Sequence, residues 1–234
     1  MEYHCKKCND TGFVTFWHNG VEYAKPCNCY KARKSLENAE KSGFGCLLDI
    51  YTFDRFSTDL GFQKRLYDRA QKYLNENGNK WFAVFGKSGA GKSHICTAIC
   101  KAFLEKGIEV RFISWLDTIR QLKAVANDPA YEQIIEPIKN AEVLYVDDFF
   151  KNETYAKPTP ADIKIANEIF NYRYNKSRRE TAVCKTLLSS EKSFFDIMEY
   201  DEAIAGRIYE MAGEFTTNLK EDAINYRLKN IKNC

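Results

Sequence analysis

The sequence has little net charge and no long apolar run, and each absence excludes a class of protein. Its 35 basic and 32 acidic residues leave a formal net charge of only +3. The charge as a whole therefore does not indicate a nucleic-acid-binding protein, and any such contact has to be local. No apolar segment approaches the length that crosses a membrane, and residues 1–7 lack the apolar core of a signal peptide. We therefore expect a cytoplasmic protein without a membrane partner.

Internal repeats and low-complexity tracts are also absent from the 234 residues. Hydrophobic residues make up 44% of the chain and aromatic residues 14%, which is enough for one good-sized core with a small appendage. Nine cysteines are present, but in a reducing cytoplasm they are not expected to form a disulfide framework. Metal binding is the better explanation for any cluster of them.

Four cysteines do cluster near the N-terminus, as two close pairs. They are Cys5, Cys8, Cys27 and Cys29. The segments on either side of Asn19-Gly20 predict a hairpin, and a zinc ribbon uses such a hairpin to bring two cysteine pairs into a tetrahedral site. Zn²⁺ would supply about 10–16 kcal/mol of the folding free energy of so short a segment. The second pair is closer than the usual C-x-x-C, so His4 or His18 stays open as a replacement ligand, and four unliganded thiols are the alternative.

Residues 86–93 match the phosphate-binding pattern G-x-x-x-x-G-K-S. In this pattern glycines let backbone N–H groups surround a phosphate chain, Lys92 neutralises it and the Ser93 hydroxyl holds Mg²⁺. An apolar run over residues 81–85 predicts a strand before the loop, and apolar residues at helical spacing predict a helix over 94–106. The helix N-terminus then adds its dipole to the anion site.

Two later strands end in polar side chains. A β-branched apolar run over residues 143–148 ends in Asp147 and Asp148. At such a position one carboxylate holds Mg²⁺ through water and its neighbour orients or deprotonates the attacking water. A strand over residues 182–188 precedes Ser189, Ser190 and Glu191, which we expect beside the terminal phosphate.

The remaining pattern predicts an α/β protein with a parallel sheet flanked by helices. Expected helices cover residues 62–75, 114–126, 131–139, 161–175 and 202–211, with a polar helix or linker over 30–42, a strand over 108–113, a loop over 151–160 and an edge strand over 215–219. The basic end of the helix over 161–175 offers a weak candidate contact for DNA, because cations are favourable there in any case. Its residues are Arg173, Lys176, Arg178 and Arg179.

Taken together, these motifs resemble the DnaC/IstB branch of the AAA+ ATPases, and within it the helicase loaders of Gram-positive bacteria and their phages. Residues 143–150 resemble the family's Walker B segment, residues 169–175 its "INYRYNN" helix, and residues 186–191 its sensor-1 strand. Residues 203–210 are similar to box VII, and the cysteine pairs with residues 10–12 are similar to the zinc-binding head of such loaders.

The resemblance implies a P-loop NTPase of the AAA+/ASCE type with a small zinc-ribbon-like domain before it. It divides the chain into a zinc-binding head (1–30), a linker helix (31–50) and an AAA+ ATPase domain (51–234). Little chain follows Arg207, so the C-terminal lid is expected to be truncated or absent.

The resemblance also assigns roles to individual residues. The ATP phosphates would be bound by Gly86, Lys87, Ser88, Gly89, Ala90, Gly91, Lys92, Ser93 and His94. Ser93 and Asp147 would hold Mg²⁺, and Lys92, Asp147, Asp148 and Arg207 would form the catalytic set. Arg207 would reach the nucleotide of a neighbouring subunit as an arginine finger. Ser190 or Glu191 would sense the γ-phosphate, although the Asn usual at this place is absent. Arg227 would replace the sensor-2 arginine or is a surface residue.

The implied function is an ATP-dependent replicative helicase loader, which binds a DnaB-type hexameric helicase and single-stranded DNA and self-associates. An IstB-type transposition helper shares the same ATPase core and is the main alternative. A small-molecule kinase is a further alternative, which the arginine of the box VII-like segment disfavours.

Overall fold

The computed structural model describes residues 5–41, 44–152, 157–179 and 182–219. A five-stranded parallel sheet with the order β4-β5-β6-β3-β7 forms its centre. The strands are β3 (Phe82–Phe85), β4 (Val110–Ser114), β5 (Val143–Asp147), β6 (Lys185–Ser190) and β7 (Thr216–Asn218). Because β6 lies between β3 and β5, the loop after β3 and the acidic end of β5 meet on the two sides of one strand. The predicted α/β fold with a parallel sheet is confirmed.

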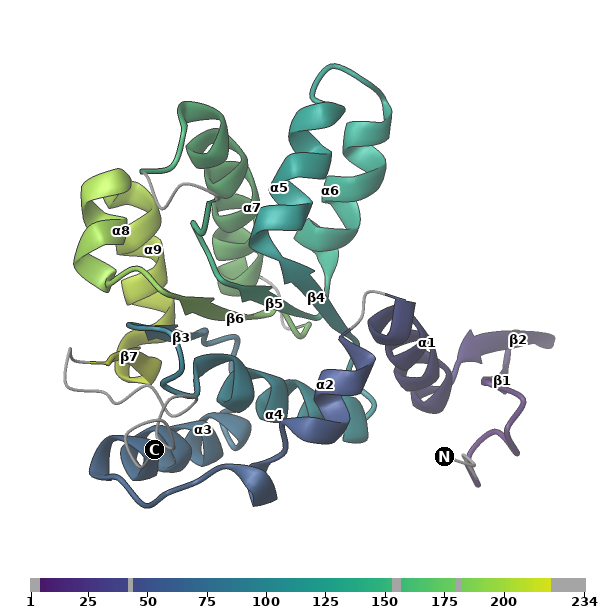
Figure 1. The fold of residues 1–234 in the computed structure, drawn as a ribbon. Helices are drawn as coiled ribbons and strands as arrows, with labels where there is room; N and C mark the ends of the chain where they lie inside the picture. The colour runs from purple at the N-terminus through teal and green to yellow at the C-terminus, as the bar shows by residue number, and fades with distance from the viewer. Residues whose placement is uncertain (1–4, 42–43, 153–156, 180–181, 220–234) are drawn as a thin grey trace.

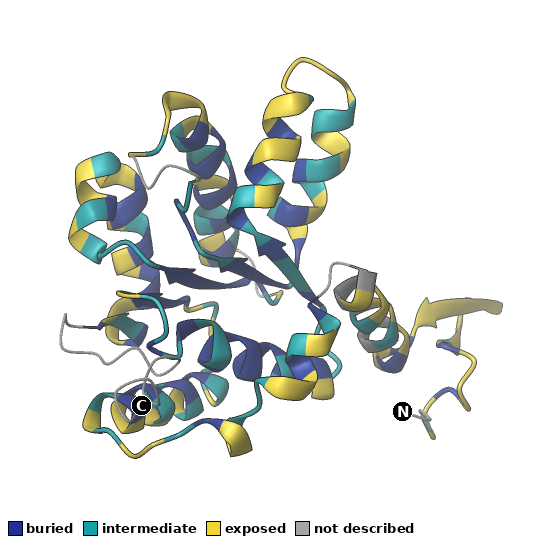
Figure 2. Ribbon diagram, viewed as in Figure 1, coloured by how far each residue is buried: buried dark blue, intermediate teal, exposed yellow. Residues whose placement is uncertain are grey.

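Helices cover both faces of the sheet (Figure 1). On one face lie α3 (Gly61–Leu74) and α4 (Lys92–Glu105), and on the other lie α5 (Trp115–Ala124), α6 (Ala130–Asn140), α7 (Pro160–Arg179), α8 (Phe194–Tyr200) and α9 (Glu202–Ala212). Along β3, Phe82 and Val84 enter one core while Ala83 and Phe85 enter the other. This alternation explains why the strands read as continuous apolar runs, since parallel strands are buried on both faces. Figure 2 shows β3, β6 and most of β5 as buried.

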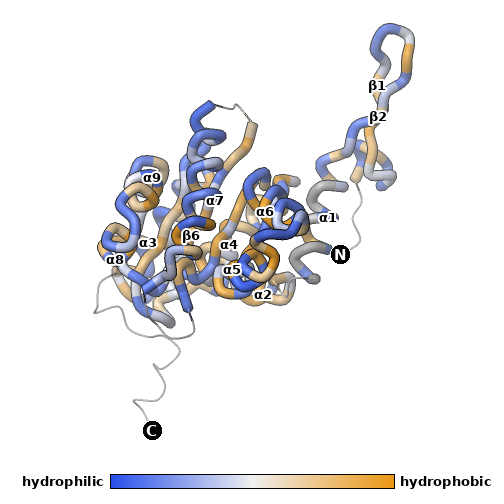
Figure 3. Tube along the Cα trace, turned by 90° about the horizontal axis from the view of Figure 1, so that it is seen from above, coloured by the Kyte–Doolittle hydropathy of each residue, from blue (hydrophilic) through white to orange (hydrophobic). Residues whose placement is uncertain are grey.

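The cysteine-containing segment forms a separate antiparallel hairpin of β1 (Phe13–His18) and β2 (Val21–Pro26). It projects away from the rest of the chain in both Figure 1 and Figure 3. Helix α1 (Asn28–Lys41) begins within the second cysteine pair and leads to the part of the chain that contains the five-stranded sheet. A Cβ added at Gly107 would lie 3.0 Å from the Asn28 side chain, so this helix starts in close contact with the turn after α4.

Residues 31–50, which were expected to form a linker helix, contain most of α1 and the whole of a second helix, α2 (Gly45–Ile50). Phe44 and Leu48 are buried in the core beneath the sheet, and the Phe44 ring stacks on Phe112 at 4.3 Å. These contacts attach α2 to the core beneath the five-stranded sheet. The domain boundaries themselves stay a prediction.

Two further differences concern helices near the sheet. The helix expected to end at residue 175 continues to Arg179, and α8 was not predicted at all. A local signal for α8 exists, because Ser193 and Asp196 form a capping box at its start. The expected truncation of the lid falls on residues 220–234, outside the described residues. No helix in the described part of the chain is both long and apolar enough to cross a lipid bilayer.

Candidate functional site

The loop between β3 and α4 has a backbone that only glycine accommodates easily at three points. Gly86, Gly89 and Gly91 have φ angles of +129°, +78° and +88°. A Cβ at Gly86 would lie 2.7 Å from the carbonyl oxygen of Leu219, and one at Gly91 would lie 3.0 Å from the Phe56 ring. The positive φ at Gly91 directly precedes the first turn of α4, which begins at Lys92. The loop therefore presents the helix N-terminus to an anion.

Lys92 is buried at the start of α4, and its Nζ donates to the carbonyl oxygen of Lys87 at 2.8 Å. Burial lowers the pKa of this ammonium, while the nearby Glu191, Asp148 and Asp147 carboxylates act in the opposite direction. A buried cation beside an anion-binding loop is what phosphate binding requires.

Asp147, at the end of β5, accepts hydrogen bonds from three side chains. Its Oδ1 receives the Ser93 hydroxyl at 3.0 Å, the Tyr145 phenol at 2.6 Å and the Ser189 hydroxyl. Ser93 and Asp147 were predicted to share Mg²⁺, and the fold brings them together. A hydroxyl and a carboxylate are the hard oxygen ligands that Mg²⁺ prefers, so this donor set fits the ion. The sequence reasoning missed Tyr145, although it lies two residues before Asp147 and thus on the same face of the strand.

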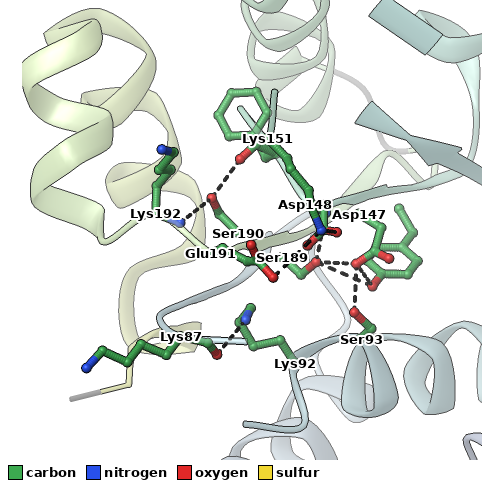
Figure 4. Close-up of polar contacts among 12 residues, drawn as sticks. Lys87, Lys92, Ser93, Asp147, Asp148, Lys151, Ser189, Ser190, Glu191 and Lys192 are labelled. Carbon is green, nitrogen blue, oxygen red and sulfur yellow. Dashed lines mark hydrogen bonds and ion pairs between the residues drawn. The ribbon is translucent and has the colours of Figure 1, made fainter. Parts of the chain in front are cut away.

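The end of β6 places its polar side chains in different directions (Figure 4). The buried Ser190 hydroxyl donates to the carbonyl oxygen of Phe149 at 2.7 Å, whereas Glu191 lines the cavity beside the phosphate loop. The Ser189 hydroxyl, which was expected beside the terminal phosphate but not as a sensor, accepts the Asp148 N–H at 3.2 Å. Of the two predicted sensor residues, only Glu191 therefore faces the cavity, and its sensing role stays a prediction.

Lys151 joins this acidic end of the sheet and was not predicted as a site residue. Its Nζ lies 2.7 Å from Asp148 Oδ2 and 3.7 Å from Glu191 Oε1. Both carboxylates are thus engaged by a cation that comes from the turn after β5.

A cavity of about 270 Å³ extends from the phosphate loop to the segment before α3. Its lining residues are Tyr51, Arg55, Phe56, Ser57, Gln63, Ser88, Gly89, Gly91, Lys92, Ser93, His94, Asp148, Lys151 and Glu191. At one end the His94 ring stacks on Tyr51 at 4.9 Å and meets the Phe56 ring edge-on at 5.1 Å. His94 Nε2 donates to the Thr52 carbonyl oxygen at 2.8 Å, and burial lowers its pKa. This aromatic end fits a nucleobase, while the lysine-rich end fits phosphates.

Arg207 lies on α9 and is not among the residues that line this cavity. Its guanidinium is 5.9 Å from the centre of the Tyr174 ring. Its buried Nη1 has no hydrogen-bond partner within the described part of the chain. Arg227 lies outside the described residues.

The interpretation of Arg173 as a candidate DNA contact is wrong. Arg173 is 0% exposed and donates to the carbonyl oxygens of Lys139, Ala141 and Lys185 at 3.0, 2.8 and 2.6 Å. It also donates to the Thr186 hydroxyl at 2.9 Å. The arginine therefore ties α7 to the sheet. Lys176 donates to Asn140 at 2.9 Å, while Arg178 and Arg179 are exposed.

The four N-terminal cysteines converge, with all their Sγ atoms within 4.8 Å of one another. Cys8, Cys27 and Cys29 are buried. Burial and the neighbouring sulfurs raise the pKa of the Cys29 thiol to about 12, a penalty that a bound cation removes. His18 lies at the opposite end of the hairpin, paired with Val21, and His4 lies outside the described residues. Four thiols in this arrangement fit Zn²⁺.

Comparison with known proteins places this site in a family. A family model described as "IstB-like ATP binding protein" matches residues 36–228. The phage-like element PBSX protein XkdC of Bacillus subtilis (strain 168) is 28% identical over 244 residues, which cover 98% of this chain and 88% of that protein. The replicative helicase loader DnaC of Escherichia coli (strain K12) is 27% identical over 122 residues, half of each chain.

The fold agrees with these matches. A crystal structure of the DnaC helicase loader superposes with a TM-score of 0.60 at 22% identity, over 69% of this chain and 93% of that one. Since the family model spans most of the sequence and the P-loop lies within it, the chain belongs to the IstB-like ATP-binding proteins, and it has the fold of the DnaC ATPase.

Proposed function

We propose that this chain is an ATP-dependent loader of a DnaB-type hexameric helicase. The observation that carries the proposal is the cysteine head joined to an ATPase part by α1. The DnaC relative is itself a replicative helicase loader. In this proposal Cys5, Cys8, Cys27 and Cys29 hold Zn²⁺ and give the hairpin its fold.

The hairpin offers a surface for the helicase. Its exposed apolar side chains are Phe13, Phe16, Trp17, Val21 and Tyr23. Trp17 is 71% exposed, and Lys25 lies over the Phe16 ring at 5.5 Å. Exposed aromatic side chains gathered on a small projecting element are typical of a protein interface and of its energetic hot spots.

In the ATPase part, each residue would act on the nucleotide from its observed position. Lys92 would hold the β- and γ-phosphates, Ser93 and Asp147 would hold Mg²⁺, and Asp148 would orient the attacking water. When bound, Mg²⁺ supplies charge that stabilises the transferred phosphoryl group.

Self-association would complete the site with Arg207 from a neighbouring copy. Arg207 lies away from its own cavity, and three apolar side chains on α8 and α9 are exposed. They are Phe195, Met198 and Tyr209. Exposed apolar side chains on the same helices as Arg207 are suited to contact with a second copy of the chain.

The proposed contact with single-stranded DNA depends on local cations, because the net charge of the chain is only +3. A salt titration tests it: contacts with Z phosphates of a single strand predict a slope of about −0.7Z in log affinity against log salt. A flat response would show that the chain acts on protein alone.

The helicase contact is tested with Trp17→Ala in the full chain. We expect binding to a DnaB-type helicase to weaken by about tenfold or more, as for a hot-spot aromatic. ATP turnover of the isolated chain should stay unchanged. Tyr172→Ala, which removes an exposed aromatic side chain from α7, is the matched control. Unaltered helicase binding by Trp17→Ala would contradict the role of the hairpin.

An IstB-type transposition helper is the second candidate, because the matching family model bears that name and begins at residue 36, after the hairpin. Stimulation of a transposase by the purified chain, without any affinity for a replicative helicase, would favour it. A small-molecule kinase has no support from the family assignment.

A further inference from the structure

The turn after β5 bends back over the acidic end of the sheet. Asp148 and Phe150 both have left-handed backbones, with φ angles of +54° and +57°. The Lys151 N–H closes the turn on the Asp148 carbonyl oxygen at 2.8 Å. Left-handed conformations are unfavourable for residues with a Cβ and persist only where the surroundings enforce them. In this turn the two left-handed residues direct the Lys151 side chain back toward the end of β5.

The Lys151 ammonium lies between two carboxylates. Its Nζ is 2.7 Å from Asp148 and 3.7 Å from Glu191, and the three side chains are 32%, 29% and 23% exposed. Lys151 lines the cavity of about 270 Å³ together with Lys92, and also a second cavity of about 220 Å³ that shares Ser88 and Glu191. It therefore lies where the linings of the two cavities share residues, and Figure 4 shows its ammonium beside Asp148.

The carboxylates at the phosphate end of the cavity disfavour a terminal phosphate unless a cation faces that phosphate. Asp148 and Glu191 both line the cavity beside the phosphate loop, and each would repel the extra negative charge that distinguishes ATP from ADP. Lys92 and Ser93 lie on the α4 side of the cavity. On the side of β5 and β6, Lys151 is the cation already held between these two carboxylates.

We propose that Lys151 is a γ-phosphate ligand that exchanges partners when ATP binds. Without a γ-phosphate the ammonium is paired with Asp148; with one, it binds a terminal phosphate oxygen and releases Asp148 to orient water. Glu191 keeps the ammonium within reach in both states. The pair of Lys151 and Glu191 thus takes the place of the Asn that is usual at the end of this strand, β6.

This exchange deepens the proposed nucleotide cycle and rests on it. A ligand shifts such an equilibrium only by its different affinity for the two states. ATP meets this condition, because its γ-phosphate offers the Lys151 ammonium a charged hydrogen-bond acceptor that ADP lacks.

The test compares the affinity of the full chain for a non-hydrolysable ATP analogue and for ADP, both with Mg²⁺. Lys151→Met should weaken binding of the analogue by about tenfold to a hundredfold, the range for a charged hydrogen bond, and change ADP binding by less than about twofold. Lys151→Arg should retain the preference for the analogue. Lys192→Met is the matched control, because Lys192 lines the second cavity but not the first.

A second variant tests the exchange in the opposite direction. Asp148→Asn removes the partner that competes with the γ-phosphate for Lys151, so the affinity for the analogue should rise while ADP binding stays the same. This arm remains informative if Lys151→Met fails to fold.

Three outcomes would overturn the proposal. Equal losses for both nucleotides would make Lys151 a general electrostatic contributor. Unchanged affinities with normal turnover would make its ion pairs merely structural, and unchanged affinities with faster turnover would make it a restraint on Asp148 only. Because no helicase or DNA is present in these measurements, their failure would leave the proposed loading function untouched.

Discussion

At the scale of the residue, Asp147 is held by three hydrogen bonds before any cation binds. The Tyr145 phenol is one of the donors, at 2.6 Å. Burial raises the pKa of this phenol well above its ordinary value, and the Asp147 charge adds to the effect. Tyr145 therefore stays protonated and donates, so it orients Asp147, the proposed magnesium ligand.

Tyr145→Phe should accordingly weaken Mg²⁺ binding to the nucleotide complex by about tenfold, as removal of such a supporting hydrogen bond does. The fold should lose only about 1 kcal/mol, the usual net value of one hydrogen bond. Titration of nucleotide binding with Mg²⁺ measures the first effect and urea unfolding the second. Tyr131→Phe is the control, since it removes a similar bond to Glu168 on the distant α6 and α7 pair. Equal Mg²⁺ affinity in both variants would contradict this role.

Lys185 supplies a pH-dependent contribution to stability. Lys185 lies at the start of β6, and its Nζ donates to the carbonyl oxygens of Glu76 and Gly78. Desolvation lowers the pKa of Lys185 from 10.5 to about 8. Between pH 8 and pH 10.5, Lys185 is therefore mostly neutral in the folded chain and still protonated in the unfolded chain. Stability from this group is therefore lowest below pH 8 and rises as the pH increases towards 10.5.

Urea unfolding of the native chain and of Lys185→Met at several pH values isolates this contribution. The native chain should gain stability relative to the variant from about pH 8 upwards, with a constant difference below pH 8. A difference that stays constant across the whole range, or one that moves against the native chain, would refute the lowered pKa of Lys185.

At the scale of the element, α7 is fastened to the sheet by the buried Arg173. The guanidinium satisfies carbonyl oxygens at the end of α6 and the start of β6. Replacing it leaves several buried acceptors without a donor, each of which costs about 1–3 kcal/mol.

Arg173→Met should therefore lower the free energy of unfolding by roughly 3–5 kcal/mol. Arg179→Met on the exposed side of the same helix should change it by less than about 0.5 kcal/mol. Urea unfolding of the two variants decides the matter. Comparable stability would mean that the buried hydrogen bonds of Arg173 are replaced by other contacts.

The hairpin is an element without a core of its own. Its buried side chains are three cysteines, packed against Cys5 and Val14. Because so little apolar surface is buried, we expect the proposed Zn²⁺ to supply most of its stability.

Chelation should thus expose the amides of β1 and β2 to hydrogen exchange while β3 and β5 keep their protection. Mass spectrometry of exchanged peptides reports both regions in one sample. Cys46→Ser, which changes an exposed cysteine on α2, should leave the exchange unchanged. Protection of the hairpin that survives chelation would argue against a structural metal.

At the scale of the whole molecule, the cavity and Arg207 lie on different parts of the same chain. The cavity follows the loop after β3, whereas Arg207 lies on α9 beside Tyr174. An arginine finger from a neighbouring copy is worth about 10³ to 10⁵ in rate. The rate of ATP turnover would then depend on the self-association of the chain.

Mixing two inactive variants tests this arrangement. Lys92→Ala and Arg207→Ala should each lose about 10³-fold or more of the turnover, and an equimolar mixture should recover part of it, because some interfaces combine an intact Lys92 with an intact Arg207. ATPase rates at increasing total concentration are the measurement. A mixture as inactive as its components would mean that Arg207 acts only within its own chain.

Local chemistry made much of this architecture predictable from sequence. The phosphate loop, the strands on either side of it and the acidic end of β5 are continuous segments, and their patterns depend only on neighbouring residues. The cysteine pairs and the Asn19-Gly20 turn likewise predicted a hairpin that the structure contains.

Residues that act across the sheet were harder to predict. Lys151 looks like an ordinary loop lysine until two left-handed residues turn it back onto Asp148. Ser189 and Ser190 are adjacent and chemically identical, yet one hydroxyl meets Asp147 and the other a backbone carbonyl.

The sequence by itself thus determined that this protein binds a nucleotide, because a phosphate loop is built from consecutive backbone groups whose conformations depend on local glycines. Only the tertiary structure decided which side chains surround the phosphate end and which arginines are buried. The strand order and the alternation of side chains between the two faces bring together residues that are far apart along the chain. The neighbours of a cationic side chain, rather than its type, therefore decide its role. Arg173 supports the fold, whereas Lys151 faces the site.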